Sequence, residues 1–276
     1  MAGPVPFERI GGHLTVVPVE LDGSVPSRFV LDTGIGFPLI SRELAQRLGC
    51  SAIGAPYIGR RMSGQSLSVP LGVVRSLRLG DLVRHDVTVG IFDLRPMFAA
   101  YPMIEGFLAP GFFEPAAFTL RPSHATVDVE DATTLAGLRA RGTTVPMQVV
   151  RDGPSVTLFT WLRLPTGQPV KVEIDTGSDA LILNRPLLEE LGLDERSPDV
   201  RSVRGTDETG RAYVRWFASL RGPVSFEAAP KLVQSRVEAM FQEIIYDGLL
   251  GTRMLDRYDA TFDVAGARLT LAPAGP

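Results

Sequence analysis

Two aspartates, Asp32 and Asp175, carry the clearest chemical signal in this 276-residue sequence, because each stands in the same phrase. Residues 29–34 read Phe-Val-Leu-Asp-Thr-Gly, and residues 172–177 read Val-Glu-Ile-Asp-Thr-Gly. Each phrase predicts a buried strand that ends abruptly at the aspartate. If two such units face each other, the carboxyl groups meet, and close carboxyl groups do not readily both ionise. One then keeps a proton while the other acts as a base, which is the chemistry that adds water to an amide.

The repeat extends well beyond these two phrases. The aspartates are 143 positions apart, and Thr119 recurs as Thr261 at an offset of 142. Gly-Phe-Leu at residues 106–108 recurs as Gly-Leu-Leu at residues 248–250, again at an offset of 142. An offset this constant predicts two copies of one unit, and hence two lobes related by a pseudo-twofold axis.

With these motifs the chain resembles the aspartic peptidases, and specifically the retropepsin-like bacterial group in which both halves are fused in one chain. The resemblance covers residues 5–130 and 145–272. It rests on the two Asp-Thr-Gly phrases and on a downstream pattern of two apolar residues and a glycine, which is intact at residues 249–251. The first copy departs from this pattern, since Ala109 replaces the glycine seen at Gly251.

The resemblance implies an all-β, bilobal acid protease fold with two β-barrel-like lobes. We expect the first lobe at residues 1–130, an inter-lobe connection at 131–144 and the second lobe at 145–276. A short helix is expected after each aspartate strand, with Ser41 and Asn184 as the N-cap residues.

The resemblance also implies roles for the residues that follow each aspartate. The two threonine hydroxyls are expected to hydrogen-bond across the axis, and the glycine amides to donate to the carboxylates. Ser178 brings a hydroxyl beside Asp175, whereas Ile35 offers Asp32 nothing polar, so we expect Asp32 to hold the shared proton more often. The residues expected to support the pair are Thr33, Gly34, Thr176, Gly177 and Ser178.

Two polar segments that contain glycine, residues 59–67 and 205–213, are expected to form hairpin flaps over the cleft. The expected substrate-binding residues at their tips are Ser63, Gly64, Gln65, Thr209 and Gly210. An ordinary exposed hairpin is an equally good interpretation of any one of these residues.

Composition favours a globular enzyme, with 45% hydrophobic residues, 21% charged residues and a net charge of −3. The negative charge and the lack of a basic stripe argue against nucleic acid as a partner. No apolar run is long enough to span a bilayer, and no signal-peptide pattern is visible, so we expect a cytoplasmic monomer without a membrane partner. The three histidines are scattered, and we expect neither a metal ion nor a cofactor.

The expected activity is endopeptidase hydrolysis of a polypeptide, with Asp32 and Asp175 activating a water molecule. Two alternatives stay open. The same pair of carboxyl groups suits acid–base chemistry on a small molecule, such as cyclisation, dehydration or ester hydrolysis, and the fold also suits a non-catalytic peptide-binding protein. The intact pair speaks against the binding protein, whereas nothing in the sequence separates a peptide from a small-molecule substrate.

Overall fold

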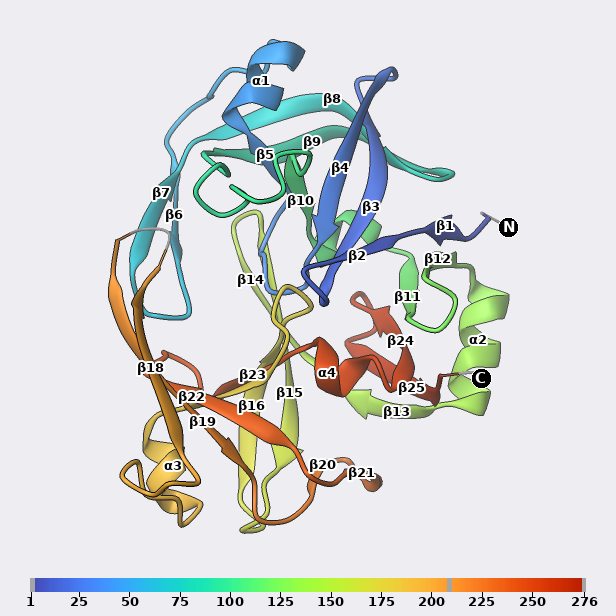
Figure 1. Ribbon diagram of the computed structural model, residues 1–276. Coiled ribbons are helices and arrows are strands. Elements are labelled where there is room, and N and C mark those ends of the chain that lie inside the picture. Colours follow the sequence, from blue (N-terminus) through green and yellow to red (C-terminus); the bar gives the residue numbers. More distant parts are fainter. Residues whose placement is uncertain (1–2, 208–209, 275–276) are drawn as a thin grey trace.

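A computed structural model of the chain describes residues 3–207 and 210–274. Three large sheets and one separate hairpin make up the molecule, so the all-β, bilobal fold expected from the sequence is confirmed. Figure 1 shows the first half of the chain at the top, the second half at the bottom, and a sheet built by both halves at the right.

The first half is a barrel in which six strands close on themselves, since β3 pairs with β8 at the end of the strand order. Buried and exposed residues nearly alternate along β8, as expected for a strand with one face toward the barrel interior. Its strands are β2 (Glu8–Ile10), β3 (Leu14–Leu21), β4 (Val25–Leu31), β5 (Leu39–Ser41), β8 (Leu71–Leu79), β9 (Leu82–Phe92) and β10 (Gly106–Leu108), of which β2 extends the barrel beside β3.

The second half forms a ten-stranded sheet whose main path runs from β18 to β21, with β14 paired to β15 beside that path. Its strands are β14 (Gln148–Asp152), β15 (Ser155–Arg163), β16 (Pro169–Ile174), β17 (Leu181–Asn184), β18 (Arg201–Thr206), β19 (Ala212–Ser219), β20 (Val224–Phe226), β21 (Ala229–Gln234), β22 (Glu238–Gln242) and β23 (Gly248–Leu250).

The two halves share one strand arrangement around the aspartates. In the first half, β10 lies between β4, to which it is parallel, and β5, to which it is antiparallel. In the second half, β23 lies between β16 and β17 with the same two orientations. The strands that precede the aspartates, β4 and β16, therefore occupy equivalent central positions, which is the arrangement that the sequence repeat predicts.

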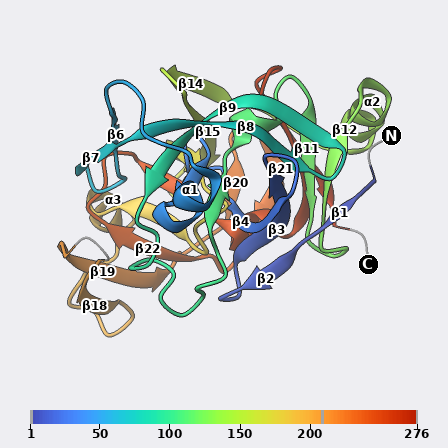
Figure 2. The same cartoon turned by 90° about the horizontal axis from the view of Figure 1, so that it is seen from above.

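A six-stranded sheet joins the two halves, in the order β1-β12-β11-β24-β25-β13. The pairing of β11 with β24 brings the halves together, and the Phe118 and Phe262 rings stack there with centroids 4.8 Å apart. Figure 2 shows this end of the molecule opposite the separate hairpin of β6 (Tyr57–Arg60) and β7 (Ser66–Val69). The strands of this sheet are β1 (Val5–Pro6), β11 (Ala117–Arg121), β12 (Thr126–Glu130), β13 (Thr143–Pro146), β24 (Tyr258–Asp263) and β25 (Arg268–Pro273).

The helix after the first aspartate strand, α1 (Arg42–Leu48), begins where the sequence predicts. The Ser41 side chain accepts a hydrogen bond from the Leu44 amide at 3.0 Å, and Gly49 ends the helix with a left-handed φ of 63°. The other helices are η1 (Pro110–Phe113), a 3₁₀ turn, α2 (Ala132–Arg141), α3 (Pro186–Glu190) and α4 (Thr252–Leu255).

The N-cap expected at Asn184 is wrong. Asn184 is the last residue of β17, and its side-chain amide donates to the Ile244 carbonyl at 3.0 Å. Arg185 takes the N-cap position with helical φ and ψ angles and provides no side-chain cap. The Asn184 amide therefore ties β17 to the loop before β23 and does not start the helix.

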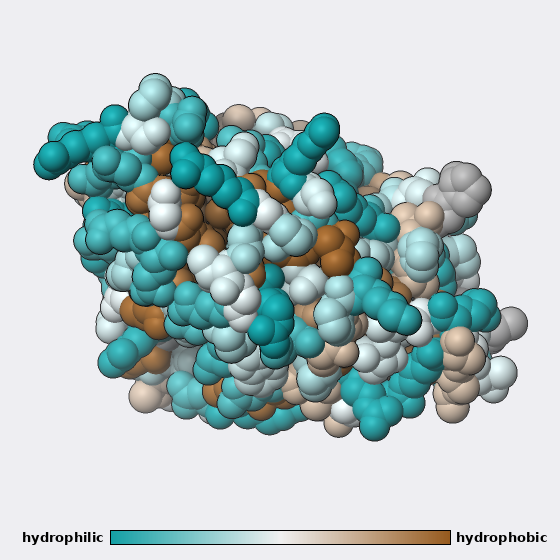
Figure 3. Space-filling view, turned by 90° about the horizontal axis from the view of Figure 1, so that it is seen from below, coloured by the Kyte–Doolittle hydropathy of each residue, from teal (hydrophilic) through white to brown (hydrophobic). Residues whose placement is uncertain are grey.

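No helix among the described residues is long and apolar enough to cross a membrane. Figure 3 shows the molecule from below, where hydrophilic side chains cover most of the face and apolar ones gather in small, separate patches.

Candidate active site

Asp32 follows directly after β4, and Asp175 follows directly after the equivalent strand β16 of the second half. The Asp32 amide donates to the Leu108 carbonyl at 3.0 Å, and the Asp175 amide donates to the Leu250 carbonyl at 3.1 Å. Each aspartate is therefore fixed to a buried neighbouring strand, β10 or β23, in the same way. Fully buried strands hold these positions more rigidly than loops do.

Crossed hydrogen bonds between the two threonines lock the halves together below the aspartates. The Thr33 hydroxyl accepts from the Thr176 amide at 3.1 Å and donates to the Ile174 carbonyl at 2.7 Å. The Thr176 hydroxyl repeats both bonds in reverse, with the Thr33 amide at 3.0 Å and the Leu31 carbonyl at 3.1 Å. Each hydroxyl thus hydrogen-bonds across the axis, as expected, and its partners are backbone groups of the opposite half.

The glycines of the two motifs leave room for the opposite carboxyl group. The amides of Gly34 and Gly177 donate to the carboxyl groups of Asp32 and Asp175 at 2.8 and 2.9 Å, as expected. A Cβ atom on Gly34 would lie 2.6 Å from Asp175 Oδ1, and a Cβ on Gly177 would lie closer still to Asp32 Oδ2. Only glycine permits the two carboxyl groups to approach each other here.

The surroundings of the two carboxyl groups differ, and they favour a proton on Asp175. Burial and the charge of Asp32 raise the pKa of Asp175 well above its usual value, although the amides of Gly177 and Ser178 oppose this rise. Burial also raises the pKa of Asp32, but the amides of Gly34, Gly177 and Ile35 and a hydrogen bond from Asp175 counteract the rise.

The expectation that Asp32 holds the proton more often rested on side chains alone, and these surroundings favour the opposite division. That expectation weighed the side chains of Ile35 and Ser178, whereas burial, the other aspartate of the pair and main-chain amides also act on each carboxyl group. Ile35 lowers the pKa of Asp32 through its backbone N–H, which a side-chain argument does not see.

A cleft opens beside the pair, with a cavity of about 310 Å³. Gly34 and Asp175 line it together with apolar side chains of both halves, among them Phe37, Met97 and Leu249. The Phe37 and Tyr57 rings meet edge to face at 5.1 Å in its wall. An apolar cavity that contains a few polar groups is the usual form of a ligand site.

The first flap is the hairpin of β6 (Tyr57–Arg60) and β7 (Ser66–Val69), and its turn contains the predicted residues Ser63, Gly64 and Gln65. Gly64 has a φ of 79°, and the Gln65 carbonyl accepts from the amide at residue 61 at 2.9 Å. The Met62 carbonyl accepts from the Ile245 amide at 2.8 Å, so the tip of this flap rests on the second half.

The second flap is the hairpin of β18 and β19, and it faces the first across another cavity of about 440 Å³. Arg61 of the first flap and Asp207 of the second form an ion pair at 3.9 Å. Gly210 lies exposed at the second tip with a φ of 83°. The predicted residue Thr209 lies outside the described part of the chain.

Sequence reasoning missed Glu173, a third carboxyl group beside the pair. Glu173 is only 6% exposed, and the negative charges of Asp175 and Asp32 act on it. The available signal was an acidic residue at the position where the first copy has Val30. Among the described residues, no group of three or more His, Cys, Asp or Glu side chains is arranged to hold a metal ion.

Two β-rich halves that meet at paired Asp-Thr-Gly loops, with hairpins over the cleft, define the acid-protease class of folds. A family model described as aspartyl protease matches residues 17–108, from β3 to β10, and this match includes Asp32 and the first flap. This match supports an aspartyl protease over the first half of the chain, with protease-type hydrolysis as the general reaction class. No curated protein matches the chain.

Proposed function

We propose that this protein is an aspartic endopeptidase in which Asp32 and Asp175 together activate a water molecule. One observation carries the proposal. The two carboxyl groups, each at the end of an equivalent strand, meet at the junction of the halves, where Thr33 and Thr176 lock the backbones. The match of residues 17–108 to the aspartyl protease family supports hydrolysis as the reaction class.

The unequal surroundings of the pair suggest separate roles for the two carboxyl groups. The ionised Asp32 takes a proton from a water molecule while the oxygen of that water attacks the carbonyl carbon. Asp175 gives its proton to the carbonyl oxygen. The proton on Asp32 then passes to the amide nitrogen, the C–N bond breaks, and Asp175 regains a proton from a hydroxyl of the diol. No bond forms between the enzyme and the substrate.

The flaps support an extended polypeptide as the substrate. Hairpins above a cleft offer main-chain groups to an extended chain, as an added strand would use them. The Ser63 hydroxyl is shielded from solvent at the tip of the first flap and has no hydrogen-bond partner among the described residues. A substrate backbone crossing the cleft would provide one. Because one chain contributes both aspartates, a monomer is sufficient for activity.

Digestion of a diverse peptide library, with the products identified by mass spectrometry, tests the proposal. The wild-type protein should cleave internal bonds, and Asp32→Asn and Asp175→Asn should each lower kcat/KM by about 100-fold to 10,000-fold. Asp81→Asn, at an exposed aspartate outside the cleft, is the matched control and should retain full activity. Equal cleavage by wild type and either active-site variant would refute the role of the pair.

A peptide with a central statine hydroxyl supplies the second readout. The hydroxyl would take the position of the attacking water and bind both carboxyl groups, so binding should weaken in both asparagine variants. Turnover of a small molecule without any binding of peptides would replace this proposal with the small-molecule enzyme. No turnover of either kind would leave the peptide-binding protein.

A further inference from the structure

Glu173 places an ionisable group at a strand position that is apolar in the first half. Its counterpart in the first half, Val30, is completely buried in a hydrophobic cluster. Glu173 and Asp175 are two residues apart along an extended segment, so their side chains lie on the same face. Both line the cavity of about 310 Å³ beside the carboxyl pair.

The Glu173 carboxyl group has no partner within the described protein. No hydrogen bond or ion pair engages it, and its strand neighbours are the apolar residues Phe159 and Leu249. Lys171 is on the same face of β16, but its ammonium group lies over the Phe159 ring, 4.8 Å from the centroid. Burial, followed by the charges of Asp175 and Asp32, raises the pKa of Glu173 well above its usual value.

Two arginines of the first flap, Arg60 and Arg61, line the same cavity and do not neutralise this group. Arg61 is paired with Asp207, and the charges that act on Glu173 are those of the two aspartates. The three acidic groups also do not form a metal cluster among the described residues. Burying an ionised carboxyl group without a partner costs free energy. Glu173 is only 6% exposed and borders an open cavity, so a ligand in that cavity could supply the missing partner.

We propose that Glu173 determines specificity by binding the cationic end of a lysine or arginine side chain next to the scissile bond. The inference rests on the endopeptidase function proposed above. A basic side chain has an aliphatic stem that suits the walls made by Tyr57, Tyr246 and Leu249, and a charged end that Glu173 accepts. Glu173 is thus a substrate-binding residue, separate from the pair that performs the chemistry.

Matched peptides test this specificity in the full-length chain. Each peptide carries lysine, arginine, glutamine or norleucine at one of the two residues that flank the cleaved bond, norleucine being an uncharged analogue of lysine. The wild type should prefer lysine or arginine at one of these positions. Glu173→Gln and Glu173→Val, the latter restoring the residue of the first half, should lower kcat/KM for that basic peptide by about 10-fold to 100-fold.

Cleavage of the norleucine peptide separates the specificity from the catalytic function. The ratio of kcat/KM for the basic peptide to that for the norleucine peptide should fall toward one in both variants. Loss of norleucine cleavage in Asp32→Asn tests the proposed function on its own. Glu189→Gln, at an exposed glutamate on α3, is the control and should keep the wild-type preference. An identical preference in wild type and both Glu173 variants would overturn the inference, as would a wild-type preference for norleucine or glutamine.

Binding of statine-type peptides, with lysine or norleucine beside the statine, measures the same site without turnover. Calorimetry should show tighter binding of the lysine peptide to wild type and equal binding of both peptides to Glu173→Val. Equal binding of the two peptides to wild type would contradict the inference even if no substrate were cleaved.

Discussion

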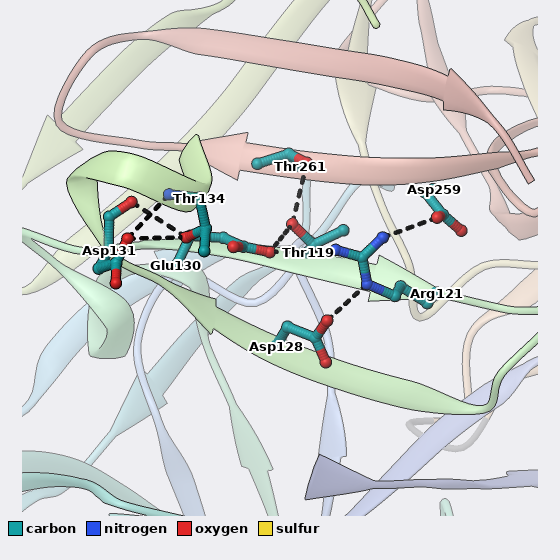
Figure 4. A network of polar contacts seen from close by, with 8 residues as sticks. All are labelled: Thr119, Arg121, Asp128, Glu130, Asp131, Thr134, Asp259 and Thr261. Carbon is teal, nitrogen blue, oxygen red and sulfur yellow. Dashed lines mark hydrogen bonds and ion pairs between the residues drawn. The ribbon is translucent and has the colours of Figure 1, made fainter. Parts of the chain in front are cut away.

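Thr119 and Thr261 are equivalent positions of the two sequence copies, and their hydroxyl oxygens lie 2.9 Å apart in the sheet that both halves build. Thr119 donates to a Glu130 carboxyl oxygen at 2.6 Å, so the hydroxyl of Thr261 donates to Thr119. Figure 4 shows this chain of contacts together with Arg121. Two pairs of equivalent threonines therefore meet where the halves join. Thr33 and Thr176 lie next to the aspartates, and Thr119 and Thr261 lie in the shared sheet.

We expect Thr119→Val to lower the free energy of unfolding by about 1–3 kcal/mol, because the buried Thr261 hydroxyl loses its acceptor. Glu130 then keeps only Arg121 as a side-chain donor among the described residues. Thr261→Val removes a single donor and should cost less. The double variant should cost less than the sum, since both variants break the same bond. Urea unfolding measures all three, with Thr88→Val on β9 as the control; strictly additive losses would contradict the coupling.

Arg121 is the cation of the same network. It contacts three carboxylates, those of Asp128, Glu130 and Asp259, which are all largely shielded from solvent. Arg121→Met leaves these negative charges uncompensated and should destabilise the protein by about 3 kcal/mol near pH 7.

Urea unfolding near pH 7 measures the loss caused by Arg121→Met. The matched control is Arg75→Met, because the Arg75 side chain is 81% exposed and its ion pair with Asp22 should be worth about 0–1 kcal/mol. Equal destabilisation by the two variants would show that the network around Arg121 adds nothing to the joint between the halves.

Gly34→Ala and Gly177→Ala test the close approach of the carboxyl groups. The added methyl group would push the opposite aspartate aside, and a displacement of about 1 Å is expected to lower kcat by about 100-fold. Gly137→Ala in α2, far from the cleft, should leave kcat unchanged. Circular dichroism confirms that each variant folds, and a folded Gly34→Ala variant with wild-type kcat would exclude the tight packing described above.

Stability should depend on pH through the carboxyl groups of the cleft. In the unfolded chain these groups titrate near pH 4, whereas burial raises the pKa of Asp175 and of Glu173 in the folded protein. The folded protein then holds more protons than the unfolded chain above that pH. The stability that these groups contribute is complete below the unfolded pKa and is lost as the pH rises through the folded pKa.

Asp175→Asn should therefore be more stable than wild type at pH 7, and the difference should disappear near pH 4. Scanning calorimetry measures it, with about 2–4 °C in Tm expected for each kcal/mol. Asp81→Asn serves as the exposed control at both pH values. A lower Tm for Asp175→Asn than for wild type at pH 7 would show that the ionised carboxylate is stabilised in the fold.

The sequence alone determined which strands carry the aspartates and that two copies of one unit exist. Local pattern suffices for this, since an apolar run that ends in Asp-Thr-Gly specifies a strand and a turn wherever it occurs. The same holds for Ser41, whose hydroxyl caps the helix that follows it in the chain. Prediction from the local pattern fails for Asn184, because its side chain donates to the carbonyl of Ile244, 60 positions away.

Only the tertiary structure shows which main-chain groups surround the two aspartates. The main-chain amides that reach Asp32 include that of Gly177 from the other half, and no local pattern shows this. The shared sheet is equally hidden in the sequence, since the pairing of β11 with β24 joins residues 142 positions apart. A glutamate in the sequence of a strand gives no sign that it is buried. The burial of Glu173 beside two other carboxyl groups results only from the way the halves fold together.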